Sequence, residues 1–304
     1  MFQKLRKSKK LVLIAMACAT FAIAGCGSDT TKSIADNGKS VTWSETFDGT
    51  KTDFAVKSSP THAVSMSQAT TEMMLQLGLE DKMAGTAFKE EEIYPPLQAA
   101  YDKVKVLSDK WPSYEVFMSV KPDFATGWPD SFSKRAIPAD KMIAQKVNIW
   151  LPESMLSTKA DLETNFNDMI KLGEIFGVKP KAEEWVAGQR KTLEAIQTKL
   201  KDLPRKRVFI YDSEDGQPFT AFEGYTTNIL KLIGADNVMS GLGVDKTWAK
   251  GSWETVITQN PDYIIIADYG TSIRNDDDFQ QKIEKIKSNP QLQDITAVKE
   301  GHFI

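Results

Sequence analysis

Six aromatic residues stand where side chains can bind a ligand. Each follows the end of a predicted strand or lies in the loop before a predicted helix: Phe88, Trp111, Trp128, Phe219, Trp248 and Tyr269. In open α/β sheets, ligands bind outside the carboxyl ends of the strands. Taken singly, each ring is more often part of a core. Together they predict an aromatic-lined cleft that suits a large, partly apolar ligand.

A second pattern occurs twice, about 140 residues apart. In each copy a serine and an aromatic residue precede a glutamate, and Pro-Asp begins seven positions after it: Glu115 with Pro122, and Glu254 with Pro261. Ser113 and Ser252 predict helix N-caps, and a carboxylate in the first turn suits the helix dipole. The repeat predicts one helix–strand unit used twice, with an exposed glutamate in the same place. The alternative is that the order of a helix, a proline that ends it and a strand is common in α/β proteins in general.

Other reactive residue types give little support to catalysis or to a bare-metal site. The chain has no Gly-x-Ser-x-Gly, phosphate-binding glycine loop or HExxH motif. The acidic runs 90–92 and 276–278 are interpreted as solvated surface. A receptor for bare Zn²⁺ or Mn²⁺ needs several histidines with carboxylates, and the chain has only His62 and His302, both interpreted as structural or surface residues. No metal ligands are predicted, and a chelated metal is favoured over a free one.

The N-terminus predicts export. Basic residues between Lys4 and Lys10 precede an apolar stretch from 11 to 24, too short to span a bilayer and typical of a signal peptide. It ends at Cys26 in a tetrapeptide that resembles a bacterial lipobox, which implies a lipidated Cys26 and anchoring at the outer face of a membrane. The alternative is a secretory signal cut nearby. The only other cysteine, Cys18, lies within the peptide that would be removed, so no disulfide or thiol chemistry is expected.

The pattern of elements predicts an α/β protein with two Rossmann-like lobes, one long interlobe helix and a ligand cleft between the lobes. The predicted parts are a signal peptide (1–25), a flexible tether (26–40), an N-terminal lobe (41–160), a linker with the long helix (161–203) and a C-terminal lobe (204–304). A routine surface helix is the alternative for 181–201. The last residues, 297–304, are predicted as a strand, so the C-terminal lobe is expected to be incomplete. The net charge of -3 gives no support to nucleic-acid binding.

The chain resembles the class III, helical-backbone solute-binding lipoproteins of ABC importers, which are receptors for ferric siderophores, haem and vitamin B12. The segments that carry the resemblance are 63–73, 77–79, 114–123, 218–224, 234–238 and 253–270. It implies that Glu115 and Glu254 dock onto arginines of a permease dimer, one per subunit. It also implies that five of the rings, all but Tyr269, match aromatic positions of vitamin B12 receptors. One departure is the stretch 221–224, which lacks a basic ligand contact of some relatives.

These observations together predict a lipid-anchored, extracytoplasmic receptor, monomeric and without a cofactor. It is expected to bind a metal chelate and deliver it to an ABC permease dimer. The alternatives are a receptor for a bare metal ion or another cofactor-like solute, or, in a different class, an extracytoplasmic enzyme or adhesion module on a similar scaffold.

Overall fold

An antiparallel hairpin opens the part of the chain that the structure describes. The structure is a computed structural model in which residues 40–268 and 279–304 are described. Strands β1 (Val41–Phe47) and β2 (Thr50–Val56) pair along their full length. Asp48 and Gly49 connect them with φ angles of 47° and 78°, the left-handed pair that a two-residue hairpin turn requires. This turn sets the register in which Phe47 pairs with Thr50.

A five-stranded parallel sheet, here called the N-terminal sheet, follows the hairpin. Its strands are β3 (Ala63–Ser65), β4 (Met83–Ala87), β5 (Val106–Ser108), β6 (Phe124–Thr126) and β7 (Asn148–Trp150). Their order is β5-β4-β3-β6-β7. The chain first adds strands on one side of β3 and then on the other. The carboxyl ends of the neighbouring strands β3 and β6 therefore mark the switch point, where such sheets bind ligands.

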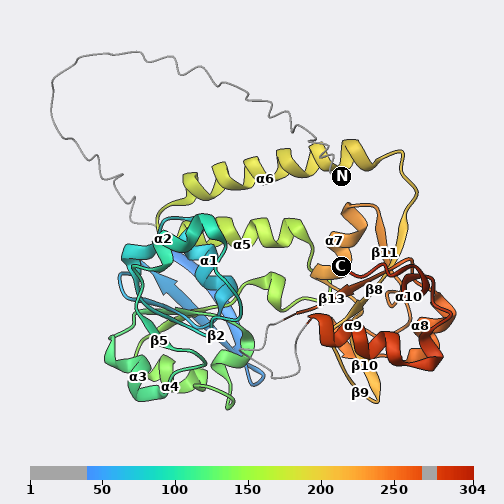
Figure 1. Ribbon diagram of the computed structural model, residues 1–304. Coiled ribbons are helices and arrows are strands. Elements are labelled where there is room, and N and C mark those ends of the chain that lie inside the picture. Colours follow the sequence, from blue (N-terminus) through green and yellow to red (C-terminus); the bar gives the residue numbers. More distant parts are fainter. Residues whose placement is uncertain (1–39, 269–278) are drawn as a thin grey trace, which may run out of the picture. The chain divides into compact units, whose positions relative to one another are not determined.

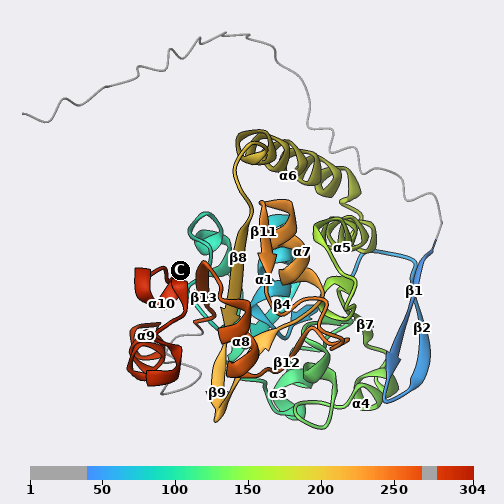
Figure 2. The same cartoon turned by 90° about the vertical axis from the view of Figure 1, so that its right-hand side faces the viewer.

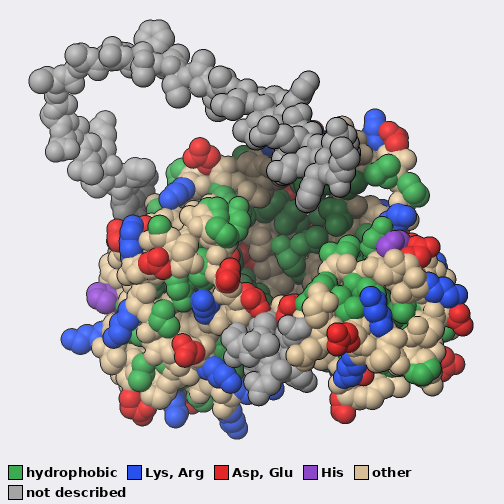
Figure 3. Space-filling model, in the orientation of Figure 1, with side chains coloured by type: hydrophobic (Ala, Val, Ile, Leu, Met, Phe, Trp, Pro, Cys, Tyr) green, Lys and Arg blue, Asp and Glu red, His purple; other side chains and the backbone are tan. Residues whose placement is uncertain are grey.

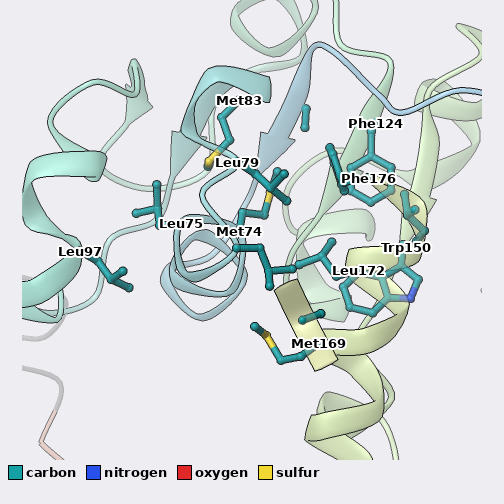
Figure 4. Close-up of a cluster of buried hydrophobic side chains, with 14 of the residues drawn as sticks. Met74, Leu75, Leu79, Met83, Leu97, Phe124, Trp150, Met169, Leu172 and Phe176 are labelled. Carbon is teal, nitrogen blue, oxygen red and sulfur yellow. The ribbon is translucent and has the colours of Figure 1, made fainter. Parts of the chain in front are cut away.

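Helices cover both faces of this sheet (Figures 1 and 2). They are α1 (Gln68–Gln76), α2 (Gln98–Tyr101), α3 (Tyr114–Ser119), α4 (Ala139–Ala144) and α5 (Leu162–Ile175). Successive strand residues face opposite sides: Phe124 joins the core with α1, α2 and α5, whereas Ala125 joins the core with α3, α4 and the hairpin. Figure 4 shows the first of these cores, where Met74 of α1 and Leu172 of α5 lie among the labelled side chains.

The long predicted helix is present as α6 (Lys179–Leu200). Its first half packs on α5 through the buried residues Ala182 and Val186, and the Trp185 ring meets Phe166 edge-on at 6.2 Å. Its second half is largely exposed and extends past the end of α5 (Figure 1). Its role as the link between two lobes stays a prediction, as do the domain boundaries drawn from the sequence.

The C-terminal sheet repeats the centre of the first. It consists of β8 (Lys206–Tyr211), β11 (Ala235–Asn237) and β13 (Tyr263–Ile266), which are parallel in the order β11-β8-β13. This matches β4-β3-β6, since in both sheets the first strand in the chain is central. The helices are α7 (Tyr225–Leu232), α8 (Trp253–Gln259), α9 (Phe279–Ser288) and α10 (Thr296–Glu300). The mixed α/β fold with parallel sheets that the sequence predicts is confirmed.

The repeated Pro-Asp has a structural role that the sequence did not reveal. The Asp123 carboxylate accepts hydrogen bonds from the backbone N–H groups of Thr61 and His62, at 2.8 and 3.0 Å, just before β3. The Asp262 carboxylate accepts one from the N–H of Arg207 at 2.8 Å, near the start of β8. In each sheet, this aspartate ties the start of one strand to the start of its parallel neighbour.

Three local expectations were wrong. Residues 297–304 are not a strand: α10 ends at Glu300, the next residue Gly301 has a φ of 70° that suits a helix C-terminus, and only Phe303 bridges to Ile264. Ser252 precedes α8 but its side chain makes no capping hydrogen bond, unlike Ser113 before α3. The expected loop at Trp248 is strand β12 in a small antiparallel sheet, because its backbone pairs with that of β10.

The remaining elements are short. The antiparallel sheet has the order β12-β10-β9 and consists of β9 (Ser213–Asp215), β10 (Gln217–Ala221) and β12 (Trp248–Lys250). Single 3₁₀ turns occur at Glu80–Lys82, Pro95–Leu97, Pro129–Phe132, Glu153–Met155 and Pro290–Leu292. Among the helices of the described residues, none has the length and apolar character needed to cross a membrane.

Candidate functional site

A cavity of about 680 Å³ lies at the carboxyl ends of the strands of the N-terminal sheet. Its wall comes from residues that follow β3, β4, β5 and β6, together with Thr226 at the start of α7 and Trp248 in β12. Four of the six predicted rings line it: Phe88, Trp111, Trp128 and Trp248. The space-filling view shows a hollow in the molecule with a largely hydrophobic floor (Figure 3).

Phe88 and Trp111 form one stacked pair in this wall. Their ring centroids are 4.6 Å apart with the planes 21° from parallel. The indole N–H of Trp111 donates to the carbonyl oxygen of Met66 at 3.1 Å, which fixes the ring at the end of β3. Phe88 has a φ of 59°, a left-handed conformation that is strained for a bulky residue. Such strain occurs mainly at sites where the surrounding structure and function require it.

Trp128 sits directly after β6 and beside a close approach of the backbone. A Cβ atom on Gly127 would come within 2.8 Å of the Cβ of Met66, so only glycine lets β6 end this close to β3. The carbonyl of Trp128 accepts from the backbone N–H of Ser131, in the turn that follows. Trp128 is therefore held at the switch point between β3 and β6.

The other two predicted rings differ in their placement. Phe219 lies in β10 and is not one of the described residues that line this cavity. Its ring is nearly parallel to that of Trp248, with the ring centroids 6.3 Å apart. Phe219 therefore stacks on a ring of the wall. Tyr269 lies outside the described residues.

Gln68 organises this wall, and the sequence analysis did not find it. As the first residue of α1, its side-chain oxygen accepts from the backbone N–H groups of Glu90 and Glu91, at 2.9 and 2.7 Å. Its side-chain nitrogen donates to the Glu72 carboxylate and to the Glu92 carbonyl, at 2.9 and 3.2 Å. All the hydrogen-bonding capacity of the amide is used. The one available signal was its position at a helix start, just after a buried strand.

Carboxylates also line the cavity, although Glu91 and Glu92 are exposed, as the interpretation of run 90–92 as solvated surface predicts. Glu90 and Glu91 belong to the wall, and Glu90 is only partly exposed. Burial raises the pKa of the Glu90 carboxyl, a hydrogen bond from the Trp128 side chain opposes this, and the charge of Glu91 raises the pKa further. Their position directly after Phe88, at a strand end, was the signal in the sequence. The second run, 276–278, lies outside the described residues.

Two further cavities adjoin this one and share residues with it. A cavity of about 370 Å³ shares Ala69, Trp128, Thr226 and Trp248 with the first and adds Tyr225 from α7. A cavity of about 600 Å³ shares Ala69 and Glu72 and extends to Trp185 of α6. The three cavities are therefore neighbours around the start of α1, and the first alone is large enough for a ligand bigger than a simple ion.

The repeated glutamates lie away from the cleft, on two helices that pack on different sheets. Glu115 is in the first turn of α3, which packs on the N-terminal sheet, and Glu254 is in the first turn of α8, which packs on the C-terminal sheet (Figure 1). Both side chains are exposed. The pKa of Glu115 is lowered, chiefly by its own backbone N–H and by Ser113.

The histidines are placed apart from the cleft. His62 is exposed before β3, and His302 stacks on Tyr263 with ring centroids 4.7 Å apart. Within residues 40–268 and 279–304, no group of three or more His, Cys, Asp or Glu side chains is arranged to hold a metal ion. Cys26 lies outside the described residues.

Comparison with known proteins gives consistent matches. A crystal structure of a periplasmic binding protein from Veillonella parvula is 96% identical, with a TM-score of 0.85 over 88% of this chain and 90% of that one. An uncharacterised ABC transporter substrate-binding lipoprotein of Bacillus subtilis is 26% identical over 86% of this chain and 82% of its own length. A vitamin B12-binding protein of Vibrio vulnificus is 24% identical over 79% of each chain.

The family match covers most of the chain. The model of the family described as periplasmic binding protein matches residues 64–304, which include both parallel sheets except for Ala63 of β3, and every described residue of the cleft wall. This family is made up of binding proteins for transport, so the expectation that the chain is not an enzyme is confirmed. The chain belongs to the periplasmic binding protein family.

Proposed function

We propose that this protein is the receptor of an ABC importer that binds a metal chelate, such as a corrinoid, a ferric siderophore or haem. The observation that carries the proposal is the cavity of about 680 Å³ into which Phe88, Trp111, Trp128 and Trp248 project from four different segments. Rings of this kind make large apolar contacts with flat or macrocyclic ligands. Similar proteins named for vitamin B12, petrobactin and haem support this ligand class.

The size of the cleft favours a chelate over the alternative of a bare metal ion. A bare ion needs a compact set of ligands at about 2 Å from the metal, whereas this wall is aromatic and spread over several segments. The Glu72 carboxylate accepts hydrogen bonds from Gln68 and Tyr94. Among the described residues, the carboxylates of the wall do not form a group that could hold a metal ion.

The exposed glutamates support the second half of the proposal, delivery to a permease dimer. Glu115 and Glu254 occupy equivalent helix starts on two separate sheets. Two negative points in equivalent settings suit a partner with two equivalent basic sockets, as a two-fold symmetric permease offers. In this proposal one monomeric receptor contacts both permease subunits.

The same proposal places the protein at the outer face of a membrane, held by acyl chains on Cys26. The apolar stretch 11–24 followed by Cys26 supports this, and the Bacillus subtilis relative is named a lipoprotein. Cys26→Ser should release the protein from membranes or leave its precursor uncleaved, measured by membrane fractionation and mass. Equal membrane retention and processing of variant and parent would exclude Cys26 as the anchor.

A thermal-shift screen tests the ligand class. Purified mature protein is heated with cyanocobalamin, ferric siderophores and haemin. A ligand present at 100 times its dissociation constant stabilises the folded state by about 2.7 kcal/mol, which is a clear shift in melting temperature. No shift with any chelate, together with a shift from free Zn²⁺ or Mn²⁺, would replace the chelate proposal with the bare-metal alternative.

A further inference from the structure

We propose that the ligand carries an uncharged arm with amide or hydroxyl groups, and that this arm binds in the cavity of about 600 Å³, here called the side cavity. The cavity of about 680 Å³, here called the aromatic cavity, binds the rest of the ligand. This inference rests on the proposed function and specifies the part of the ligand that the four rings do not contact. It follows from the side chains that three helices present to the side cavity.

Each of these helices contributes one apolar side chain and one amide to the wall of the side cavity. The pairs are Met73 and Gln76 of α1, Met169 and Asn165 of α5, and Trp185 and Gln189 of α6. The members of each pair are three or four positions apart, so they lie on the same face of their helix. The wall therefore alternates apolar surface with groups that can form hydrogen bonds.

The three amides are not used by the protein itself. Within the part of the chain that the structure describes, the side chains of Gln76, Asn165 and Gln189 make no hydrogen bond. Each amide offers two N–H donors and one oxygen acceptor. The amide of Gln68, in the wall of the aromatic cavity, is different because protein groups occupy all of its capacity. Gln68 therefore builds the site, whereas the other three amides are available to a ligand.

Trp185 adds a partly exposed ring with an unused donor. Its ring meets Phe166 edge-on at 6.2 Å, which fixes its position on α5. Its indole N–H donates to none of the described residues, whereas the indole N–H of Trp111 donates to the Met66 carbonyl at 3.1 Å. Tryptophan at a binding surface commonly combines apolar contact with one hydrogen bond. Trp185 can therefore offer both to a ligand.

The side cavity lies next to the space where the rings are. It shares Ala69 and Glu72 with the aromatic cavity, and Met73 and Asn165 with the cavity of about 370 Å³. The Glu72 carboxylate accepts from the Gln68 side chain and from the backbone N–H of Tyr94, at 2.9 and 3.2 Å, so this shared boundary is held in place. In this proposal a chelate lies against the rings and extends one arm along α1 into the side cavity.

The chemistry of the wall favours an uncharged polar arm. Side-chain amides both donate and accept, as the amide and hydroxyl groups of a ligand also do. The apolar member of each pair contacts the carbon atoms between such groups. A charged arm would exchange its hydration for neutral partners, which costs free energy, and a purely apolar arm would leave the amides without partners.

Titration calorimetry with cyanocobalamin, ferrichrome and haemin tests this inference. The first two carry several amide groups that do not coordinate the metal, whereas the peripheral polar groups of haemin are carboxylates. We expect cyanocobalamin or ferrichrome to bind. For that ligand, Gln76→Leu, Asn165→Leu and Gln189→Leu should each weaken binding by about two- to tenfold where the amide contacts the arm. The triple variant should weaken it by about tenfold or more, and any affinity for haemin should not change.

Gln145→Leu is the matched control, because Gln145 is an exposed amide after α4 that lines none of the three cavities. Its affinity should equal that of the wild-type protein. Melting temperatures without ligand show that each variant is folded, and the single variants decide the question if the triple variant is not. Unchanged or tighter binding of the amide-bearing chelate by the variants, or binding of haemin alone, overturns the arm and leaves the chelate receptor intact. Failure of every chelate to bind overturns the proposed function as well.

Discussion

At the residue scale, the aromatic residues at strand ends could be predicted because a single sequence indicates where short apolar strands end. Phe88, Trp111 and Trp128 each follow a short apolar run, and a parallel sheet brings such ends to one edge. Gln68 could not be identified in this way, because its function depends on which loop lies over α1. The partial burial of Glu90 was likewise invisible, since three consecutive glutamates are usually solvated.

A buried glutamate outside the cleft gives a stability prediction. Glu45 of β1 is 7% exposed and accepts a hydrogen bond from the backbone N–H of Leu151 at 3.0 Å. Burial raises its pKa from 4.5 to about 7, the Leu151 bond lowers it, and the charge of Asp168 raises it further. The folded protein thus keeps a proton that the unfolded chain releases, so stability falls as pH rises from about 4.5 to about 7.

Glu45→Gln should remove much of this pH dependence, because the amide keeps the acceptor for Leu151 but does not ionise. The measurement is the free energy of unfolding by urea at about pH 5 and about pH 8 for both proteins. The wild-type protein should lose more stability between these two conditions than the variant does. The same loss in both would show that the Glu45 carboxyl does not titrate in this range.

At the element scale, the sequence predicted the α/β class and the repeated helix–strand unit, but it missed the short parallel strand β11 and was wrong where the pairing partner of a segment determines its structure. The run 297–304 has β-prone residues, yet Gly301 ends a short helix there and leaves three residues to pair with β13. Trp248 lies in a strand because β10 supplies its partner, which local sequence does not record. The repeat was predicted from Glu and Pro-Asp spacing, and the matching strand orders β4-β3-β6 and β11-β8-β13 give it a physical basis.

The Pro-Asp aspartates are expected to stabilise the start of the parallel strands. Asp123→Ala leaves the N–H groups of Thr61 and His62 without this acceptor, and should cost about 0.5–1.5 kcal/mol per hydrogen bond. Asp123→Asn keeps an oxygen acceptor in the same place and serves as the matched control. Urea unfolding should rank wild type, Asn and Ala in decreasing stability. An Ala variant as stable as the parent would remove this role from the repeat.

At the scale of the whole molecule, the surfaces proposed for ligand capture and for delivery to the permease are different. The cleft is formed at the carboxyl ends of the N-terminal strands and by residues of the C-terminal part, whereas Glu115 and Glu254 are exposed on α3 and α8. Changes at the glutamates should therefore leave ligand affinity unaltered. This separation makes the permease contact testable on its own.

Glu115→Arg/Glu254→Arg should abolish ligand-stimulated ATPase activity of the reconstituted transporter while the receptor still binds its ligand. If the glutamates served only their own helices, the change would cost about 0.3–1 kcal/mol of stability at each site and would not alter transport. Glu184→Arg, at an exposed position of α6, is the control for the change in charge. Normal ATPase stimulation by the double variant would show that the repeated motif is only structural.

The central claim is that the aromatic cleft binds a chelate reversibly, and titration calorimetry tests it most directly. Using the chelate that gives the largest thermal shift, the wild-type protein should bind one molecule and release it unchanged on denaturation. Trp111→Ala, Trp128→Ala and Trp248→Ala should each weaken binding by about 1–3 kcal/mol, whereas Trp43→Phe, in the hairpin outside the cavity wall, should not. Unchanged affinity in all three cleft variants, or chemical conversion of the chelate, would contradict the account.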